Sequence, residues 1–162
     1  MGNWLDVVTI GILVVAVVVE AKRGFGRAIF DLAAVLVAVR LAYMAKDPLS
    51  ETIKVSANPS ANQAFAFAVP FALLTIVLWL LGKIVYDTTL ISAEVFEPLL
   101  GGLCGILVGI TLAHALTATI FMGGGGENLP PVIGESALGT EFLRFETYHR
   151  VVEKLYTFHR TE

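Results

Sequence analysis

Long apolar stretches alternate with short polar connections along the chain, and this pattern predicts four membrane-spanning helices. The apolar stretches cover residues 4–22, 28–45, 64–86 and 99–122. The last contains no Asp, Glu, Lys or Arg, and as an α-helix it is about 36 Å long, enough to cross a hydrocarbon core of about 30 Å. The first stretch is short, but it is long enough for a span when Trp4, an interfacial aromatic residue, and Lys22, a snorkelling cation, are counted as its two ends. We therefore expect an all-α membrane protein with four transmembrane helices.

The first stretch has an alternative interpretation as a cleaved signal peptide. A signal peptide needs a basic region before its apolar segment and a small-residue cleavage site after it. Neither is present before Lys22. We expect the first helix to be retained.

Small residues recur at every fourth position of the 99–122 stretch, at Gly101, Gly105, Gly109 and Ala113. They form a stripe along one side of a helix, on which a second helix can pack at close range. We expect this stripe to be the surface on which the other helices assemble. On this interpretation Gly105→Ala is tolerated, whereas Gly105→Leu forces the neighbouring helix away.

The connection between the first two stretches is short, basic and glycine-containing. Lys22, Arg23 and Arg27 flank Gly24 and Gly26, which predicts a tight antiparallel hairpin of the first two helices. Three cations in a short loop place it in the cytoplasm by the positive-inside rule. With four spans, both termini are then expected outside.

The remaining connections are less regular. Residues 46–63 are predicted to form an external loop around Asn58 and Pro59. Pro70 predicts a kink in the third helix. The acidic connection of residues 87–98 predicts an amphipathic turn at the membrane interface. After a transmembrane domain at 1–122, residues 123–162 form a second region of Gly/Pro linker and tail. From Gly139 onward, apolar residues at near-helical spacing predict a C-terminal amphipathic helix, with Phe142, Phe145, Val152, Leu155 and Tyr156 on its apolar face.

Composition restricts the class of protein further. Of 162 residues, 56% are hydrophobic and 15% are charged, and the mean hydropathy is +0.78, which excludes an ordinary soluble domain. The net charge of −3 and the scattered cations disfavour nucleic acid as a partner. Cys104 is the single cysteine, so no intrachain disulfide forms, and we expect a buried packing thiol in preference to a reactive one.

Several of these features together resemble the colicin V production protein family of small bacterial inner-membrane proteins. They are the Asn3-Trp4-Leu5-Asp6 opening, Arg23-Gly24-Phe25-Gly26-Arg27 followed by Asp31, and the Gly101, Gly105 and Gly109 series. The chain departs from the family pattern at Ala28, where a second glycine is usual, at Asp31, where glutamate is common, and at Glu97-Pro98, which replaces Asp-Arg. Any role of that arginine is therefore not carried over to this chain.

The resemblance implies a four-helix inner-membrane protein linked to toxin production or export and to envelope homeostasis, with no established enzymatic activity. No cofactor is expected. Some relatives carry an extracytoplasmic protease domain after the fourth helix, which agrees with an external C-terminus. The tail here is too short for such a domain. The expected partners are the lipid bilayer and either another copy of the chain or a different membrane protein.

Four charged residues fall within the predicted spans, where a charge costs about 2.5 to 3.5 kcal/mol on insertion scales. They are Asp6, Glu20, Asp31 and Arg40. In a hairpin that turns at Gly24, Asp6 faces Arg40 and Glu20 lies near Arg27, which predicts two ion pairs. Snorkelling of all four side chains to the head groups is the alternative.

His114 is the most central ionisable residue, with Thr111 and Thr117 on the same helix face. Such a polar stripe is compatible with a proton or solute path. The favoured interpretation is structural, with the imidazole and hydroxyls bonding neighbouring helices. No metal site is expected, because no ligand spacing surrounds His114.

Two functions from different classes follow. The first is a non-enzymatic scaffold or export accessory, and the second is a subunit of a small oligomeric channel or transporter with the glycine helix at the pore. An intramembrane hydrolase is disfavoured, because the sequence shows no paired aspartates, no serine with a base and no two-histidine metal motif.

Overall fold

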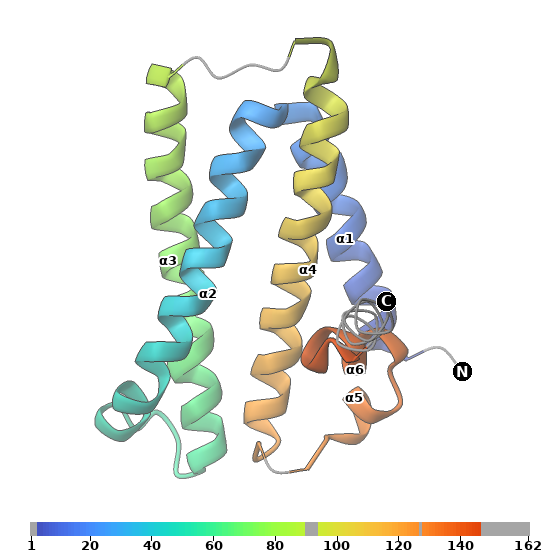
Figure 1. Ribbon diagram of the computed structural model, residues 1–162. Coiled ribbons are helices and arrows are strands. Elements are labelled where there is room, and N and C mark those ends of the chain that lie inside the picture. The colour runs from blue at the N-terminus through green and yellow to red at the C-terminus, as the bar shows by residue number, and fades with distance from the viewer. Residues whose placement is uncertain (1–2, 90–93, 127, 147–162) are drawn as a thin grey trace, which may run out of the picture.

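The computed structural model describes residues 3–89, 94–126 and 128–146 and is helical in four long segments (Figure 1). The long helices are α1 (Trp4–Arg23), α2 (Phe25–Thr52), α3 (Pro59–Thr89) and α4 (Glu97–Gly123). All four are long and apolar enough to cross a membrane. A 3₁₀ turn, η1 (Glu94–Phe96), precedes α4, and two short helices follow it, α5 (Pro131–Gly134) and α6 (Ala137–Arg144). The predicted class, an all-α protein with four spans, is confirmed.

The helices extend past the apolar stretches that predict them. α2 runs through Pro48 to Thr52, so the first part of the expected 46–63 loop is helical. Hydroxyl groups support this end, because Ser50 Oγ donates to the Asp47 carbonyl and Thr52 Oγ1 to the Pro48 carbonyl. Hydropathy indicates only the apolar part of a helix, so it does not report this polar continuation.

The turn between α1 and α2 is a single residue, Gly24, as tight as expected. Its φ of +83° is a conformation that favours glycine, and a Cβ there would lie 2.0 Å from Glu97 Oε2. The two helices then diverge and do not pack along their length. α1 packs chiefly on α4, and α2 packs chiefly on α3 and also on α4 (Figure 1).

α4 is the central helix, and its glycines face α1. A Cβ at Gly101 would lie 2.5 Å from the Glu20 carbonyl oxygen, and one at Gly105 would lie 2.7 Å from Val17 Cα. At Gly109 the nearest atom, Leu13 Cδ2, is at 3.0 Å. Backbone atoms cannot move aside as a flexible side chain can, so the helices must shift to admit Gly105→Ala, which argues against the expectation that this substitution is tolerated. Ala113, the next residue of the series, is fully buried.

Two apolar clusters hold the remaining helices on α4. Towards the end where the chain enters α1, the core joins α2, α3 and α4 through Ala42, Phe67, Ala115, Ala118 and Met122. Nearer the α1–α2 turn, Ala16, Val35 and Val108 join α1, α2 and α4. Cys104 is also buried in α4, as expected of a packing thiol.

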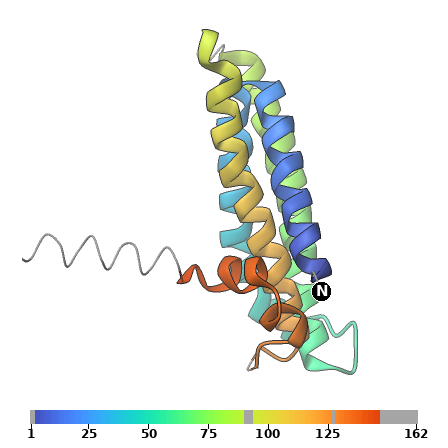
Figure 2. The same cartoon turned by 90° about the vertical axis from the view of Figure 1, so that its right-hand side faces the viewer.

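The segment after α4 returns to the start of α1, where α5 and α6 lie against the bundle (Figure 2). Asn3 Nδ2 donates to the Val132 carbonyl. The predicted C-terminal amphipathic helix is not confirmed, because α6 ends at Arg144 and Phe145 has a left-handed φ of 52°. Val152, Leu155 and Tyr156 fall outside the described residues. Of the predicted interfacial turn, the described Val95 and Phe96 lie in η1 and are 87% and 62% exposed.

Candidate functional site: a buried charged cluster

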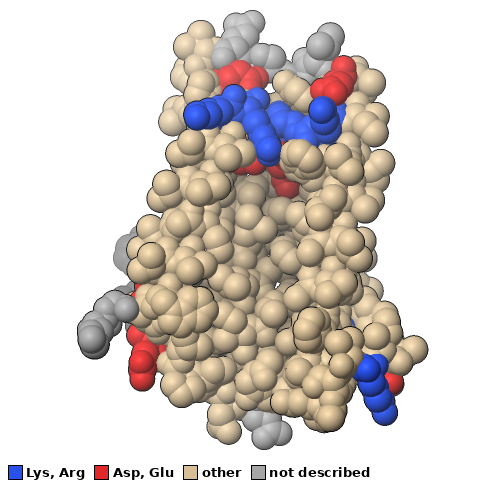
Figure 3. Space-filling view, turned by 180° about the vertical axis from the view of Figure 1, so that it is seen from behind, with Lys and Arg blue, Asp and Glu red and all other residues tan. Residues whose placement is uncertain are grey.

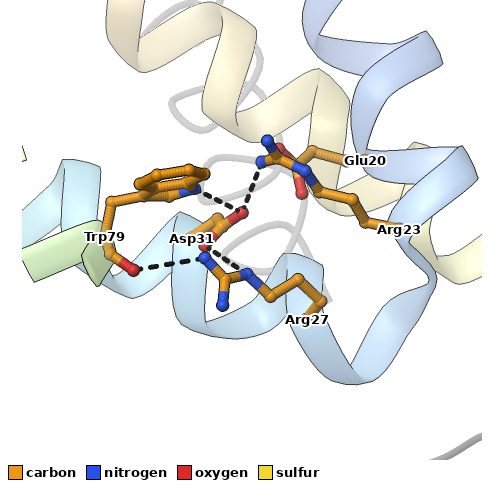
Figure 4. A network of polar contacts seen from close by, with 5 residues as sticks. All are labelled: Glu20, Arg23, Arg27, Asp31 and Trp79. Atoms are coloured by element: carbon orange, nitrogen blue, oxygen red, sulfur yellow. Dashed lines mark hydrogen bonds and ion pairs between the residues drawn. The ribbon is translucent and has the colours of Figure 1, made fainter. Parts of the chain in front are cut away.

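Five residues from three helices form a polar network beside the α1–α2 turn (Figure 4). The network consists of Glu20 and Arg23 on α1, Arg27 and Asp31 on α2, and Trp79 on α3. Glu20, Arg27 and Asp31 are 4%, 6% and 3% exposed. Seen from the opposite face to Figure 1, the Lys and Arg side chains form a band near this end of the molecule, with acidic atoms beneath it (Figure 3).

Asp31 is the centre of the network. Its Oδ2 accepts hydrogen bonds from Arg23 Nη1 at 2.8 Å and from Trp79 Nε1 at 3.1 Å. Its Oδ1 lies 3.1 Å from Arg27 Nε, an ion pair within α2 at the i,i+4 spacing that brings side chains onto one face. Asp31 therefore links α1, α2 and α3.

Arg23 reaches Asp31 because Gly24 interrupts the helix between them. Its Nη1 also lies 3.1 Å from Glu20 Oε1, one turn earlier in α1. One guanidinium thus bridges an acid on α1 and an acid on α2. Its side chain is 35% exposed, so it connects the buried acids to the surface of the molecule.

Trp79 contributes more than a hydrogen-bond donor. Arg23 Cζ and Arg27 Cζ lie 5.1 and 5.2 Å from the centroid of its ring, within the range of cation–π attraction. Its backbone carbonyl accepts a hydrogen bond from Arg27 Nη2 at 3.2 Å. The indole group and the two guanidinium groups together fasten α3 to the charged turn.

The expected pairing of Glu20 with Arg27 is wrong in its partners. Both residues lie in one cluster, but the ion pairs run from Arg23 to Glu20 and from Arg27 to Asp31. The predicted ion pair of Asp6 with Arg40 is also wrong, since no contact joins them among the described residues and Arg40 is exposed. α4 packs between the two helices there, so a hairpin register does not describe their neighbours.

Asp6 instead binds the segment after α4. Its Oδ1 accepts a hydrogen bond from Ser136 Oγ at 2.6 Å and one from the Leu138 backbone N–H at 3.1 Å. Ser136 is the N-cap of α6, where its Oγ accepts from the Gly139 N–H at 2.8 Å. An acid near the start of α1 thereby holds the start of α6.

His114 joins three helices. Its Nδ1 lies 2.7 Å from the Phe142 carbonyl of α6, and its Nε2 lies 3.1 Å from the Tyr43 hydroxyl of α2. A carbonyl oxygen only accepts, so Nδ1 is the donor in the contact with Phe142. The Thr111 and Thr117 hydroxyls donate to carbonyls of their own helix. The structure therefore supports the structural interpretation of this polar face.

Two sequence predictions remain, the position of Lys22 and the expectation of no metal site. Lys22 is exposed at the end of α1, beside Arg23. Within the ranges that the structure describes, no three His, Cys, Asp or Glu side chains gather as a metal ion would require. Sequence reasoning did not assign Trp79, Tyr43 or Ser136. Within the charged cluster, the pairs of Glu20 with Arg23 and of Arg27 with Asp31 have the i,i+3 and i,i+4 spacings that a sequence shows within one helix.

A family model described as colicin V production protein matches residues 5–143, from α1 nearly to the end of α6. The chain belongs to this family. The match includes every residue of the charged cluster and both contacts that hold α6. No match was found among curated proteins or among solved structures. As a colicin V production family protein with four candidate spans, the chain is a membrane protein.

Proposed function

We propose that this member of the colicin V production protein family is a non-enzymatic inner-membrane factor for toxin production or export and for envelope homeostasis. The family match over residues 5–143 is the observation that carries the proposal. Within the described residues, Ser136 bonds to Asp6, and His114 bonds to Tyr43 and a backbone carbonyl, so these polar groups join helices of the bundle.

We further propose that the α1–α2 turn faces the cytoplasm and that both termini lie outside. Lys22, Arg23 and Arg27 gather at this turn, and the positive-inside rule assigns such an end to the cytoplasm. The described part of the C-terminal segment lies beside the start of α1, so the two are on one side of the membrane. The proposed partners are the lipid bilayer and another membrane protein, and nucleic acid is not among them.

The glycine stripe of α4 supports packing within the chain. Gly101, Gly105 and Gly109 approach α1 of the same chain at backbone distance, so a pore lined by these glycines would require α1 to leave. A channel subunit is therefore the second candidate, and ion flux in liposomes containing the purified protein distinguishes it from the first.

The proposal is tested by deleting the gene in a strain that makes colicin V and measuring toxin inside and outside the cells. We expect less toxin outside the cells, restored by the wild-type gene. Crosslinking in intact membranes then identifies the protein partner. Unchanged toxin production and release in the deletion strain would contradict the proposed role.

A further inference from the structure

The two acids of the charged cluster are unequally supplied with hydrogen-bond donors. Asp31 accepts hydrogen bonds from Arg23 and Trp79 and forms an ion pair with Arg27. Among the described residues, the donor that reaches Glu20 is Arg23, through the same Nη1 that is closer to Asp31. Glu20 Oε2 is buried, and no described residue forms a hydrogen bond with it. Since a buried charge without donors is strongly disfavoured, the ionised form of Glu20 is poorly supported.

Asp31 also has an oxygen with spare acceptor capacity. Oδ1 lies 3.1 Å from Arg27 Nε, but the contact lacks the direction of a hydrogen bond, and Oδ1 is buried without one. Arg23 Nη1 lies 3.1 Å from Glu20 Oε1 and 2.8 Å from Asp31 Oδ2, so the two carboxyl groups are held next to each other. A proton on one of them would remove a like-charge contact and turn one open oxygen into a hydrogen-bond donor.

We propose that Glu20 and Asp31 form a proton-binding site at the charged end of the helix bundle. Glu20 is the acid that carries the proton, and its O–H donates to Asp31. The assignment follows from the donors, because three side chains support a charge on Asp31 and one supports a charge on Glu20. Glu20 takes up one proton from water and becomes neutral. The formal charges of Arg23, Arg27 and Asp31 then sum to +1.

The surrounding helices are compatible with that extra positive charge. Besides the cluster, α1 places Lys22 at its exposed end, and α3 contributes the Trp79 ring. α4 contributes the buried Cys104 thiol and Glu97, whose side chain reaches Gly24. The carboxylate of Glu97 therefore offsets the cluster. We expect protons to reach Glu20 past Arg23, whose side chain is 35% exposed. The other side of Glu20 borders an apolar groove lined by Gly11, Val15, Val108 and Leu112, which offers a proton no polar route.

Infrared difference spectroscopy in light and heavy water tests the site in the full-length protein in lipid. A protonated carboxyl group has a carbonyl band distinct from that of a carboxylate and shifted by deuteration. We expect one such band at neutral pH in wild type, its loss in Glu20→Gln, and its persistence in Glu97→Gln. The Glu97 variant makes the same substitution on an acid at the same end of the bundle.

Three results would overturn the proposal. The first is the absence of a protonated-carboxyl band in wild type at neutral pH. The second is a band that persists in Glu20→Gln. The third is a band that disappears at constant pH when sodium replaces choline. The last would mean that the two oxygens hold a metal cation and not a proton.

A second measurement does not depend on spectroscopy. If the folded protein holds a proton that the unfolded chain releases, stability falls as the pH rises. Glutamine imitates the neutral acid and still offers Asp31 a donor, so Glu20→Gln is expected to fold and to lose this decline. If Glu20→Gln and wild type show the same pH dependence of the melting temperature, the proposal is wrong.

Discussion

Trp79 Nε1 donates a hydrogen bond to Asp31 Oδ2 at 3.1 Å, which joins α3 to α2 inside the charged cluster. Trp79→Phe keeps an aromatic ring but removes this donor to a carboxylate. We expect a loss of about 1.5 to 3 kcal/mol in unfolding free energy, the range for hydrogen bonds to charged groups. Denaturant unfolding in detergent measures it. Trp4→Phe is the control, because Trp4 is 57% exposed, and an equal loss there would argue against the cluster.

Gly105→Ala is expected to destabilise the contact of α4 with α1. Its new Cβ would lie 2.7 Å from Val17 Cα and 2.8 Å from the Ala16 carbonyl oxygen, so the helices must move apart, at a cost of about 1 to 3 kcal/mol. Gly102→Ala is the matched control, because the nearest atom to its Cβ is Ala21 Cβ at 3.7 Å. Thermal unfolding of both variants is compared, and equal stability would show that the close approach is not maintained.

Asp6 is expected to couple to Ser136 and not to Arg40. Ser136 Oγ donates to Asp6 Oδ1 at 2.6 Å, and residues in such contact show non-additivity of about 0.5 to 3 kcal/mol. A double-mutant cycle with Asp6→Asn and Ser136→Ala measures this term in unfolding free energy. The parallel cycle with Arg40→Leu should be additive, and coupling there would restore the hairpin pairing.

His114→Leu is expected to release α6 from the bundle, because it removes the contacts to the Phe142 carbonyl and to Tyr43. Trypsin should then cut faster after Arg144, an exposed residue at the end of α6. Thr111→Val serves as the comparison, since the Thr111 hydroxyl bonds within its own helix. Cleavage at the wild-type rate in His114→Leu would mean that the histidine does not hold α6.

The orientation is tested with single cysteines in a Cys104→Ser background. Val55→Cys and Glu135→Cys lie at exposed positions on the side proposed to be external, and Asp87→Cys lies towards the end that bears the α1–α2 turn. An impermeant thiol reagent should label the first two in intact spheroplasts and the third only after the membrane is opened. The reverse pattern would invert the topology.

The sequence by itself determined the fold class and the order of the spans. Apolar stretches long enough to cross a bilayer predict α1 to α4, because no other backbone arrangement in an all-α chain satisfies its hydrogen bonds in lipid. The motif residues around Gly24 and the α4 glycines also carried the family resemblance, which the match over residues 5–143 confirms. Within one helix, spacing alone brings Arg27 to Asp31.

Only the tertiary structure decided which helices are neighbours. A hydropathy pattern indicates the length of each helix and its position along the membrane normal. It does not indicate which helices are neighbours, so the helix that packs on α1 is decided by the shape of the helix surfaces. The glycines of α4 admit α1 at backbone distance, which separates Asp6 from Arg40 and directs Asp6 to Ser136. The same packing brings Trp79, 48 residues away in sequence, to Asp31, and leaves Glu20 beside it with one oxygen that no described donor reaches.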